Sequence, residues 1–331
     1  MTEELLVTAR ANELIDPSLH IWTWEVAMYL FLGGLTAGVM VFAAVMALLK
    51  KDEEAPFASR QLALLAPIVL SAGMTTLFLD LEHKLFVFRF YTAFQLTSPM
   101  SWGAWILILI YPVATLQILS TLRAGFPITT PWVDRWSLPN AIVDWCEQHR
   151  RQIALVAVPS GIALGIYTGI LLSAFSARPF WNSGVLGPLF LVSGMSTAAA
   201  LVALISRHRE EKELFTRIDL ALIVVELALV GLFLINLASG SAQHIEALQS
   251  VTGGPYTMVF WALFVGIGLV IPLLLELLEM RGIAKSIAIV APVLVLIGGY
   301  ALRQVMIDVG QASTWTDYGT QYNSELLERL E

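Results

Sequence analysis

Acidic, histidine and aromatic side chains are interleaved in one short stretch of the sequence, between two long apolar segments. Residues 77–103 read LFLDLEHKLFVFRFYTAFQLTSPMSWG, with Asp80 and His83 near the start. Asp80 and, in another segment, Glu25 lie inside apolar runs, where an acid is costly and usually functional. Carboxylate and imidazole groups exchange protons with a substrate whose charge changes during a reaction. We therefore take Asp80, Glu25 and His83 as candidate catalytic acid–base residues.

Further polar and aromatic residues fall at the helix ends on the same predicted side of the protein. They are His20, Glu25, Asp80, Glu82, His83, Lys84, Tyr91, Ser98, Ser101, Trp102, Tyr167, Ser173, Asn236, His244, Glu246, Tyr256 and Arg303. A lipid-soluble quinone needs an apolar slot, a hydrogen-bonding partner at each carbonyl and an acid–base group. His20 and Tyr91 are candidate carbonyl partners, and Trp24 and Trp102 are candidate walls. Taken singly, each of these residues could instead be a solvated loop group, a helix cap or part of an interfacial aromatic belt.

Two more carboxylates, Asp219 and Glu226, lie in the apolar segment RIDLALIVVELALVG. They are about two helical turns apart and therefore share one helix face. A carboxylate in mid-membrane must be protonated, paired or connected to water. Asp219 and Glu226 could form a proton path from the cytoplasm, or a neutral carboxyl could make an interhelical hydrogen bond, and both interpretations stay open. Glu276 lies nearer the inner interface, which favours a structural role.

The composition indicates an integral membrane protein. Of the 331 residues, 57% are hydrophobic and only 14% are charged, against about 25% charged in soluble domains. The net charge of −7 comes without a basic cluster, so nothing points to nucleic acid. The single cysteine, Cys146, excludes intrachain disulfides, cysteine-ligated iron–sulfur clusters and C-x-x-C-H haem attachment. The histidines fall at predicted helix ends or in loops, so we expect no haem and no metal site in this protein.

The elements that must position these residues are membrane-spanning helices. Crossing about 30 Å of hydrocarbon takes roughly 20 apolar residues, and eight such segments occur, near 22–49, 58–80, 100–122, 152–175, 184–206, 215–238, 257–279 and 285–306. The predicted fold class is therefore all-α. Residues 21–306 form the transmembrane domain, between tails at 1–20 and 307–331. The first tail is acidic and lacks the pattern of a signal peptide.

Basic residues predict the orientation of the spans. Most of the 19 Lys and Arg residues fall in the loops after the first, third, fifth and seventh spans. Because basic loops stay on the cytoplasmic side, both termini and the loop after the second span are expected in the periplasm of a bacterial inner membrane. Within the first span, Gly34 and Gly38 have the spacing of a close helix contact.

Several motifs carry a resemblance to a known family. They are WTWEVAMYLFLGGLTAG (22–38), LDL (79–81) followed by SPMSWGAW (98–105), PFW (179–181), GGPY…FW (253–261) and GGYALRQVMIDVGQ (298–311). Together, in this order and over nearly the whole chain, they resemble the NrfD/PsrC family, the membrane subunits of polysulfide-reductase-like complexes.

The resemblance implies two four-helix bundles and no cofactor within the subunit. It implies a quinone substrate, menaquinone or ubiquinone, at the face that meets a ferredoxin-like four-cluster iron–sulfur subunit. That partner would connect to a molybdopterin catalytic subunit or to a multihaem cytochrome. Loop 81–98 would then lie at the mouth of the quinone site, beneath the iron–sulfur partner.

The resemblance also implies roles for individual residues. His20, Trp24 and Glu25 match the quinone-contacting part of the first helix, and Asp80 matches the end of the second. Arg303 matches the family's R…GQ ending, where it could hold an acid such as Asp80 or meet lipid headgroups.

Three functions remain open from the sequence. The first is a quinone-binding membrane subunit of a respiratory oxidoreductase, which exchanges electrons with an iron–sulfur partner, with or without proton translocation. The second is a secondary transporter, which eight helices, buried acids and a hint of an inverted repeat would suit. The third is a passive anchor that binds partners and no quinone.

Overall fold

The computed structural model describes residues 21–281 and 289–313, so His20, the tail 1–20 and most of the tail 307–331 lie outside it. The described residues are helical and contain no strand. Eight helices are long and apolar enough to cross a membrane, which confirms the predicted all-α class and the number of spans. They are α2 (Trp24–Leu48), α4 (Leu65–Asp80) preceded by η2 (Leu62–Leu64), α6 (Pro99–Leu119), α10 (Arg150–Ser173), α11 (Leu186–Ile205), α12 (Arg209–Ala238), η5 (Val259–Val270) continued by α14 (Ile271–Met280), and α15 (Val290–Ala312).

Two helices extend beyond the predicted spans. Helix α12 begins at Arg209 rather than near 215, and α15 continues to Ala312 rather than ending near 306. Hydropathy marks where the polypeptide crosses the hydrocarbon, whereas a helix continues for as long as its backbone hydrogen bonds and neighbouring contacts support it. The charged turn REEKEL at the start of α12 is helical for this reason.

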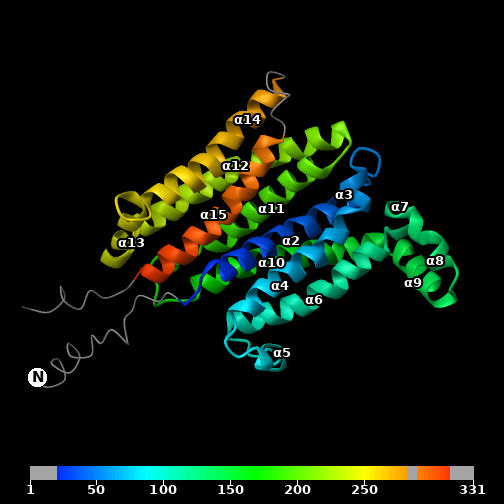
Figure 1. The fold of residues 1–331 in the computed structure, drawn as a ribbon, viewed down its shortest axis with the longest axis horizontal. Coiled ribbons are helices and arrows are strands. Elements are labelled where there is room, and N and C mark those ends of the chain that lie inside the picture. The colour runs from blue at the N-terminus through cyan, green and yellow to red at the C-terminus, as the bar shows by residue number, and fades with distance from the viewer. Residues whose placement is uncertain (1–20, 282–288, 314–331) are drawn as a thin grey trace, which may run out of the picture.

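Short helices join the spans at both ends of the molecule. They are α3 (Pro56–Arg60), η3 (Lys84–Phe86), α5 (Arg89–Thr92), α7 (Leu122–Gly125), η4 (Pro127–Thr129), α8 (Thr130–Asp134), α9 (Ser137–Gln148) and α13 (Ala242–Thr252). We call the end with α5, α13 and the start of α2 the outer end, and the end with α3 and α7–α9 the inner end (Figure 1).

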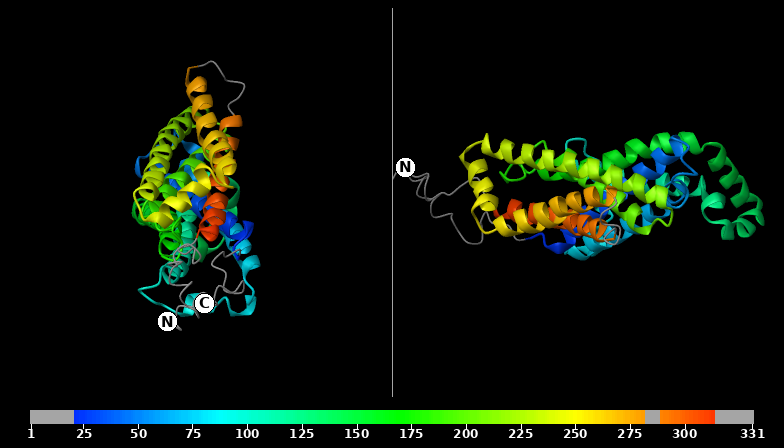
Figure 2. Two further views of the ribbon diagram at one scale, coloured as in Figure 1. Left: turned by 90° about the vertical axis from the view of Figure 1, so that its left-hand side faces the viewer. Right: turned by 90° about the horizontal axis from the view of Figure 1, so that it is seen from above.

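The spans pack as two four-helix bundles, with α2, α4, α6 and α10 in the first and α11, α12, η5–α14 and α15 in the second. Helices α2 and α10 of the first bundle contact α11 of the second, and α2 also contacts α15. The two cores lie side by side along the long molecule (Figures 1 and 2). Backbones come close at this join, because a Cβ at Gly38 or Gly194 would overlap the facing helix. The predicted contact at Gly34 and Gly38 is thereby confirmed.

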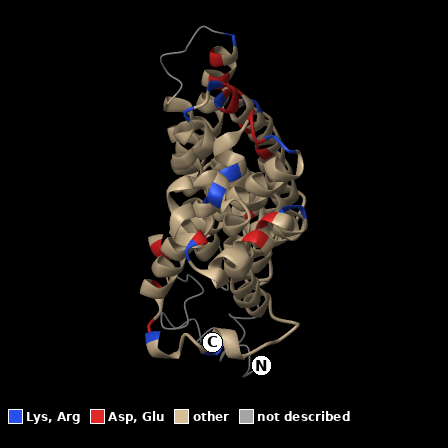
Figure 3. Cartoon of the chain, turned by 90° about the vertical axis from the view of Figure 1, so that its right-hand side faces the viewer, with Lys and Arg blue, Asp and Glu red and all other residues tan. Residues whose placement is uncertain are grey.

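Ion pairs and a buried carboxylate fasten the inner end. Asp52 accepts two hydrogen bonds from the Arg150 guanidinium, at 3.1 and 2.7 Å. Burial opposes the ionisation of Asp52, but the hydrogen bonds and charge of Arg150 outweigh it and lower the Asp52 pKa. The buried Glu211 carboxylate accepts hydrogen bonds from the Ala58 amide at 2.7 Å and the Ser206 hydroxyl at 2.6 Å. This end carries both signs of charge (Figure 3).

One glutamine fastens the outer end of α2 to the end of α15. The Trp22 amide donates to Gln311 Oε1 at 2.8 Å, and Gln311 Nε2 donates to the Trp22 carbonyl at 2.7 Å. The Trp22 ring in turn stacks on Trp181, with the ring centroids 5.5 Å apart. The start of the first bundle is therefore fixed by the second.

Replacing Gln311 by leucine is expected to destabilise the protein by about 1–3 kcal/mol, because both Trp22 backbone groups lose their partner. Thermal unfolding of the purified protein in detergent measures the effect. Gln304→Leu is the matched control, since Gln304 lies on the same helix but bonds only to Asp308 and Tyr300 within it. Equal stability of the two variants would show that the Gln311 contact does not hold the bundles together.

Candidate functional site

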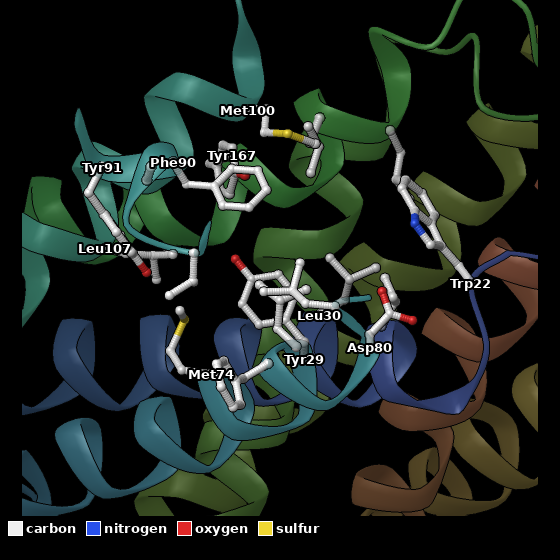
Figure 4. Close-up of a pocket in the computed structure, with 18 residues that line it drawn as sticks. Trp22, Tyr29, Leu30, Met74, Asp80, Phe90, Tyr91, Met100, Leu107 and Tyr167 are labelled. Atoms are coloured by element: carbon white, nitrogen blue, oxygen red, sulfur yellow. The ribbon is translucent and has the colours of Figure 1, made fainter. Parts of the chain in front are cut away.

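A cavity of about 500 Å³ opens in the outer half of the first bundle. It is bounded by α2, α4, α6, α10 and the loop that contains α5 (Figure 4). Its lining is mostly apolar: Trp22, Val26, Tyr29, Leu30, Met74, Leu77, Phe78, Asp80, Leu81, Val87, Phe90, Tyr91, Met100, Ala104, Leu107, Tyr167, Leu171 and Leu172. A few polar groups in an apolar slot are the usual composition of a small-molecule site.

The rotation of α2 decides which of its residues line the cavity. Val26, Tyr29 and Leu30 recur at helical spacing on the cavity side, and Trp22 lines the cavity from just before the helix. Trp24 and Glu25 fall on other faces, and Trp24 is 49% exposed. The Glu25 carboxylate accepts a hydrogen bond from the Thr23 hydroxyl and lies within electrostatic range of Asp80. Thus the structure brings Glu25 near the predicted site, but neither Glu25 nor Trp24 lines the cavity.

Two buried tyrosines face each other across the cavity. Tyr29 comes from α2 and Tyr167 from α10, and their phenol groups are close enough to interact (Figure 4). Gly103 on α6 makes room for Tyr167, since a Cβ there would overlap the phenol ring. This pair places two hydroxyl groups inside an apolar space, where they can donate to a ligand oxygen.

Asp80 ends α4 and lines two spaces at once. It belongs to the lining of the cavity and also to that of a neighbouring open groove of about 660 Å³ at the outer end. Glu82 and His83 line the groove but not the cavity. Asp80 is therefore the carboxylate placed to move a proton between the cavity and the groove, and His83 lies on the groove side.

Tyr91 and Trp102 have different positions relative to the cavity. Tyr91 lines it, and burial, with a smaller contribution from Tyr111, raises the pKa of the Tyr91 phenol, which keeps the group neutral. The Trp102 indole instead donates to the Leu96 carbonyl at 2.7 Å and so fixes the loop. Trp102 is not part of the cavity wall.

Arg303 lies away from the cavity, inside the second bundle. It is 1% exposed and donates to the Ser193 hydroxyl at 2.5 Å and to the Gly299 and Phe190 carbonyls at 3.0 Å. Its charge interacts with Glu226, which also bonds to Ser193. Neither Asp80 nor the outer surface is its partner, in contrast to the roles that the resemblance suggested. The helix rotation that aims Arg303 inward is set by packing against α11.

The predicted pair Asp219 and Glu226 belongs to the same interior. Asp219 is fully buried, accepts a hydrogen bond from Ser196 at 2.6 Å and interacts with Glu276 of α14. Glu226 is nearly as buried and approaches Ser193. The two carboxylates thus have different polar neighbours on α11, Ser196 for Asp219 and Ser193 for Glu226. Together with Glu276 and Arg303 they form one buried polar cluster inside the second bundle.

Within the described residues, no group of three or more His, Cys, Asp and Glu side chains is arranged to hold a metal ion. The cavity can take a flat, mostly apolar ligand that carries hydrogen-bond acceptors, and Asp80 can exchange a proton with it. The second bundle carries a separate buried polar cluster.

A model of the family described as polysulphide reductase NrfD matches residues 12–314. The chain belongs to the NrfD family. A protein of Wolinella succinogenes that is named as one of the chains of polysulfide reductase is 29% identical over 304 residues, which cover 88% of this chain and 94% of that protein. Protein NrfD of Escherichia coli is 26% identical, over 88% of this chain and 95% of its own length. A protein of Mesobacillus selenatarsenatis that is named as a selenate reductase subunit is 22% identical, over 78% of this chain and 67% of its own length.

Family membership agrees with the eight spans. The NrfD-family chain is a multi-pass membrane protein, and the bacterial inner membrane fits both findings. Its relatives are named as subunits of reductases, which supports a role as a membrane subunit.

Sequence reasoning missed part of the cavity of this NrfD-family protein. Val26, Tyr29 and Leu30 lie at 3–4 residue spacing on α2, and this periodicity could have found Tyr29, whereas Trp22 lies before the helix. Tyr167 was one of many outward polar residues, and only the packing against Gly103 distinguishes it. His20 lies outside the described residues.

Proposed function

We propose that this protein is the quinone-binding membrane subunit of a respiratory oxidoreductase, which exchanges electrons between the membrane quinone pool and an iron–sulfur partner. The observation that carries the proposal is the apolar cavity at the outer end of the first bundle, with three phenols and one carboxylate in its lining. Its volume of about 500 Å³ and its position beside the bilayer suit a lipid-soluble ring. Menaquinone and ubiquinone both satisfy this description.

The residues have distinct roles in this proposal. Tyr29 and Tyr167 donate hydrogen bonds to one carbonyl of the ring, and Tyr91 is the candidate donor at the other end of the cavity. Asp80 takes a proton from the quinol hydroxyl during oxidation and releases it into the outer groove, where His83 can receive it. Glu25 tunes Asp80 by charge rather than by contact.

The electrons require a carrier in a partner subunit. This sequence has a single cysteine and no pair of histidines placed within the spans, so the electron acceptor is proposed to be a cluster of a ferredoxin-like iron–sulfur subunit docked at the outer groove. A molybdopterin subunit or a multihaem cytochrome would complete the complex. The names of the polysulfide and selenate reductase relatives support a catalytic reductase subunit in the complex.

The buried cluster of the second bundle is the candidate proton path. Asp219 and Glu276 lie toward the inner end, whereas Glu226 shares Ser193 with Arg303 closer to the middle. Glu226→Gln would block such a path but leave quinol oxidation intact, so proton uptake measured in vesicles should fall while electron transfer persists. Unchanged proton uptake would leave the cluster a purely structural one.

Gly103→Ala is expected to weaken quinone binding about fivefold, because the methyl group displaces the Tyr167 phenol and one hydrogen bond is worth about 1 kcal/mol. Quinol titrations of the assembled complex measure the change in KM. Gly33→Ala is the matched control, since the space around a Cβ at Gly33 is open. A normal KM in the Gly103 variant would remove Tyr167 from the site.

Co-purification and quinone extraction test the proposal as a whole. The proposal expects a stoichiometric iron–sulfur protein and about one quinone per NrfD-family subunit in the purified complex. A subunit that purifies alone and moves a solute would favour a secondary transporter, for which the buried acids would form the substrate site. A complex with the iron–sulfur protein but without quinone would favour a passive anchor.

A further inference from the structure

The loop between α4 and α6 has two sides. One of them, which we call the polar side, lines the outer groove with Glu82, His83, Arg89, Gln95 and Ser98, together with the rings of Phe86 and Phe90. Its other side points large apolar groups outward, namely Leu85, Phe88, Phe94 and Leu96. Leu85 is 88% exposed and Leu96 is 72% exposed. Such a surface is unusual on a loop in water and requires something to cover it.

The loop lies at the flank of the bundle. Along the long axis of the molecule α5 is level with the helical part of α2, not beyond its start (Figure 1). The left view of Figure 2 shows the loop at the edge of the helices. Val87, Phe90 and Tyr91 line the cavity from this side. The loop is therefore a wall between the cavity and the surroundings of the helices.

The exposed apolar side of the loop adjoins the outer faces of two membrane-spanning helices. Leu79 on α4 and Ile108 and Leu109 on α6 are also exposed, as expected for faces that contact lipid. From residue 85 to residue 122 the sequence has one charged side chain, Arg89, which lies over the Phe86 ring at 4.5 Å. The apolar surface thus runs from α6 onto the loop with Arg89 as its single charged side chain, whereas Asp80, Glu82, His83 and Lys84 separate the loop from α4 along the sequence.

Several polar backbone groups of the loop have partners within the protein, which lowers the cost of placing it in a bilayer. The Gln95 amide donates to Ser101 Oγ at 3.0 Å, and Ser101 Oγ donates to the Ala93 carbonyl at 3.1 Å. The Leu96 carbonyl accepts from Trp102. The short helices η3 and α5 satisfy further groups.

We propose that residues 85–96 form a flap that lies in the outer leaflet of the bilayer, with lipid acyl chains against Leu85, Phe88, Phe94 and Leu96. Only the polar side of the loop, with Glu82 and His83, then remains for a protein partner, in contrast to the expectation that the whole of 81–98 lies beneath one. A quinone would enter the cavity sideways from the lipid, past the flap. This last consequence rests on the proposed function, whereas the position of the flap does not.

Spin labels on the flap test its position in the intact complex, reconstituted in phospholipid vesicles. Single cysteines at Leu85, Phe88 and Leu96, in a Cys146→Ser background, are labelled and compared in collisions with oxygen, which enters lipid, and with an aqueous nickel chelate. A label at Ile108 on α6 is the lipid-facing control. A label at the exposed Glu53 of the inner end, where no partner is proposed, is the aqueous control, with the nickel chelate on both sides of the bilayer. The proposal expects the oxygen-to-nickel ratio of the flap labels to match that at Ile108 and to exceed that at Glu53 several-fold.

Two results would overturn the proposal. A ratio equal to that at Glu53 would place the flap in water, and labels shielded from both reagents would mean that a protein partner covers it. Neither readout requires quinone, so a complex with lipid-embedded labels but no bound quinone would contradict the proposed function alone. For lateral entry, Phe88→Glu should raise the KM for a long-tailed quinol several-fold but leave that for a tailless quinol unchanged. An equal change in both would contradict entry past the flap.

Discussion

Replacing Asp80 by asparagine should abolish quinol-coupled turnover and leave the complex assembled. Among the described residues, Asp80 is the only carboxylate in the cavity lining, and it also reaches the outer groove, so no other lining carboxylate there can take over the proton. Loss of a general base costs about 10²–10⁴-fold in rate. Asparagine keeps the shape of the side chain, so helix α4 and the loop after it should hold their positions.

Turnover of the Asp80 variant is measured with a soluble quinol and an artificial electron acceptor at the partner subunit. The amount of assembled complex is measured in the same preparation. Asp308→Asn is the matched control, because Asp308 also lies near the outer end but bonds to Gln304 on its own helix and does not line the cavity. The control should retain nearly full turnover. Normal turnover in the Asp80 variant would remove this residue from the mechanism.

Replacing Arg303 by methionine should destabilise the second bundle by about 3–5 kcal/mol, because it leaves buried polar partners uncompensated. Arg303 donates to a hydroxyl and two carbonyls and faces the charge of Glu226, all in the interior. The yield of assembled protein and the midpoint of thermal unfolding measure the loss.

A double variant separates the charge from the shape. Arg303→Met combined with Glu226→Gln removes both charged side chains. The double variant is expected to recover part of the stability that Arg303→Met alone loses. Arg209→Met is the control for an exposed arginine, since water screens the surface pair of Arg209 with Glu213 and the pair adds little stability. If the double variant were less stable than Arg303→Met by the full effect of Glu226→Gln alone, the two groups would be independent.

The fold could be predicted from the sequence to a large extent, because lipid leaves a polypeptide few alternatives. Apolar length alone located eight spans, and the acid at the end of the second span marked Asp80. The start of α12 at Arg209 and the end of α15 at Ala312 were not predicted. Hydropathy marks the part of a helix that crosses the hydrocarbon, and these two helices continue beyond it.

The rotation of helices about their axes could not be predicted in the same way. Packing turns Tyr29 into the cavity and Trp24 out of it, although the two lie within two turns of each other. It likewise turns Arg303 into the second bundle, to Ser193 on a helix more than 100 residues away in sequence. Such pairings depend on tertiary contacts, so residue type and outward position alone did not distinguish Tyr167 from Trp102.

The central claim is that the first bundle holds a quinone in the cavity between Tyr29 and Tyr167. A density map of the purified complex with its native quinone tests it most directly. We expect a flat ring in the cavity, with one carbonyl at the phenols of Tyr29 and Tyr167, Asp80 at its edge and a tail that leaves past the flap. A ring bound elsewhere, or a haem between these helices, would contradict the account.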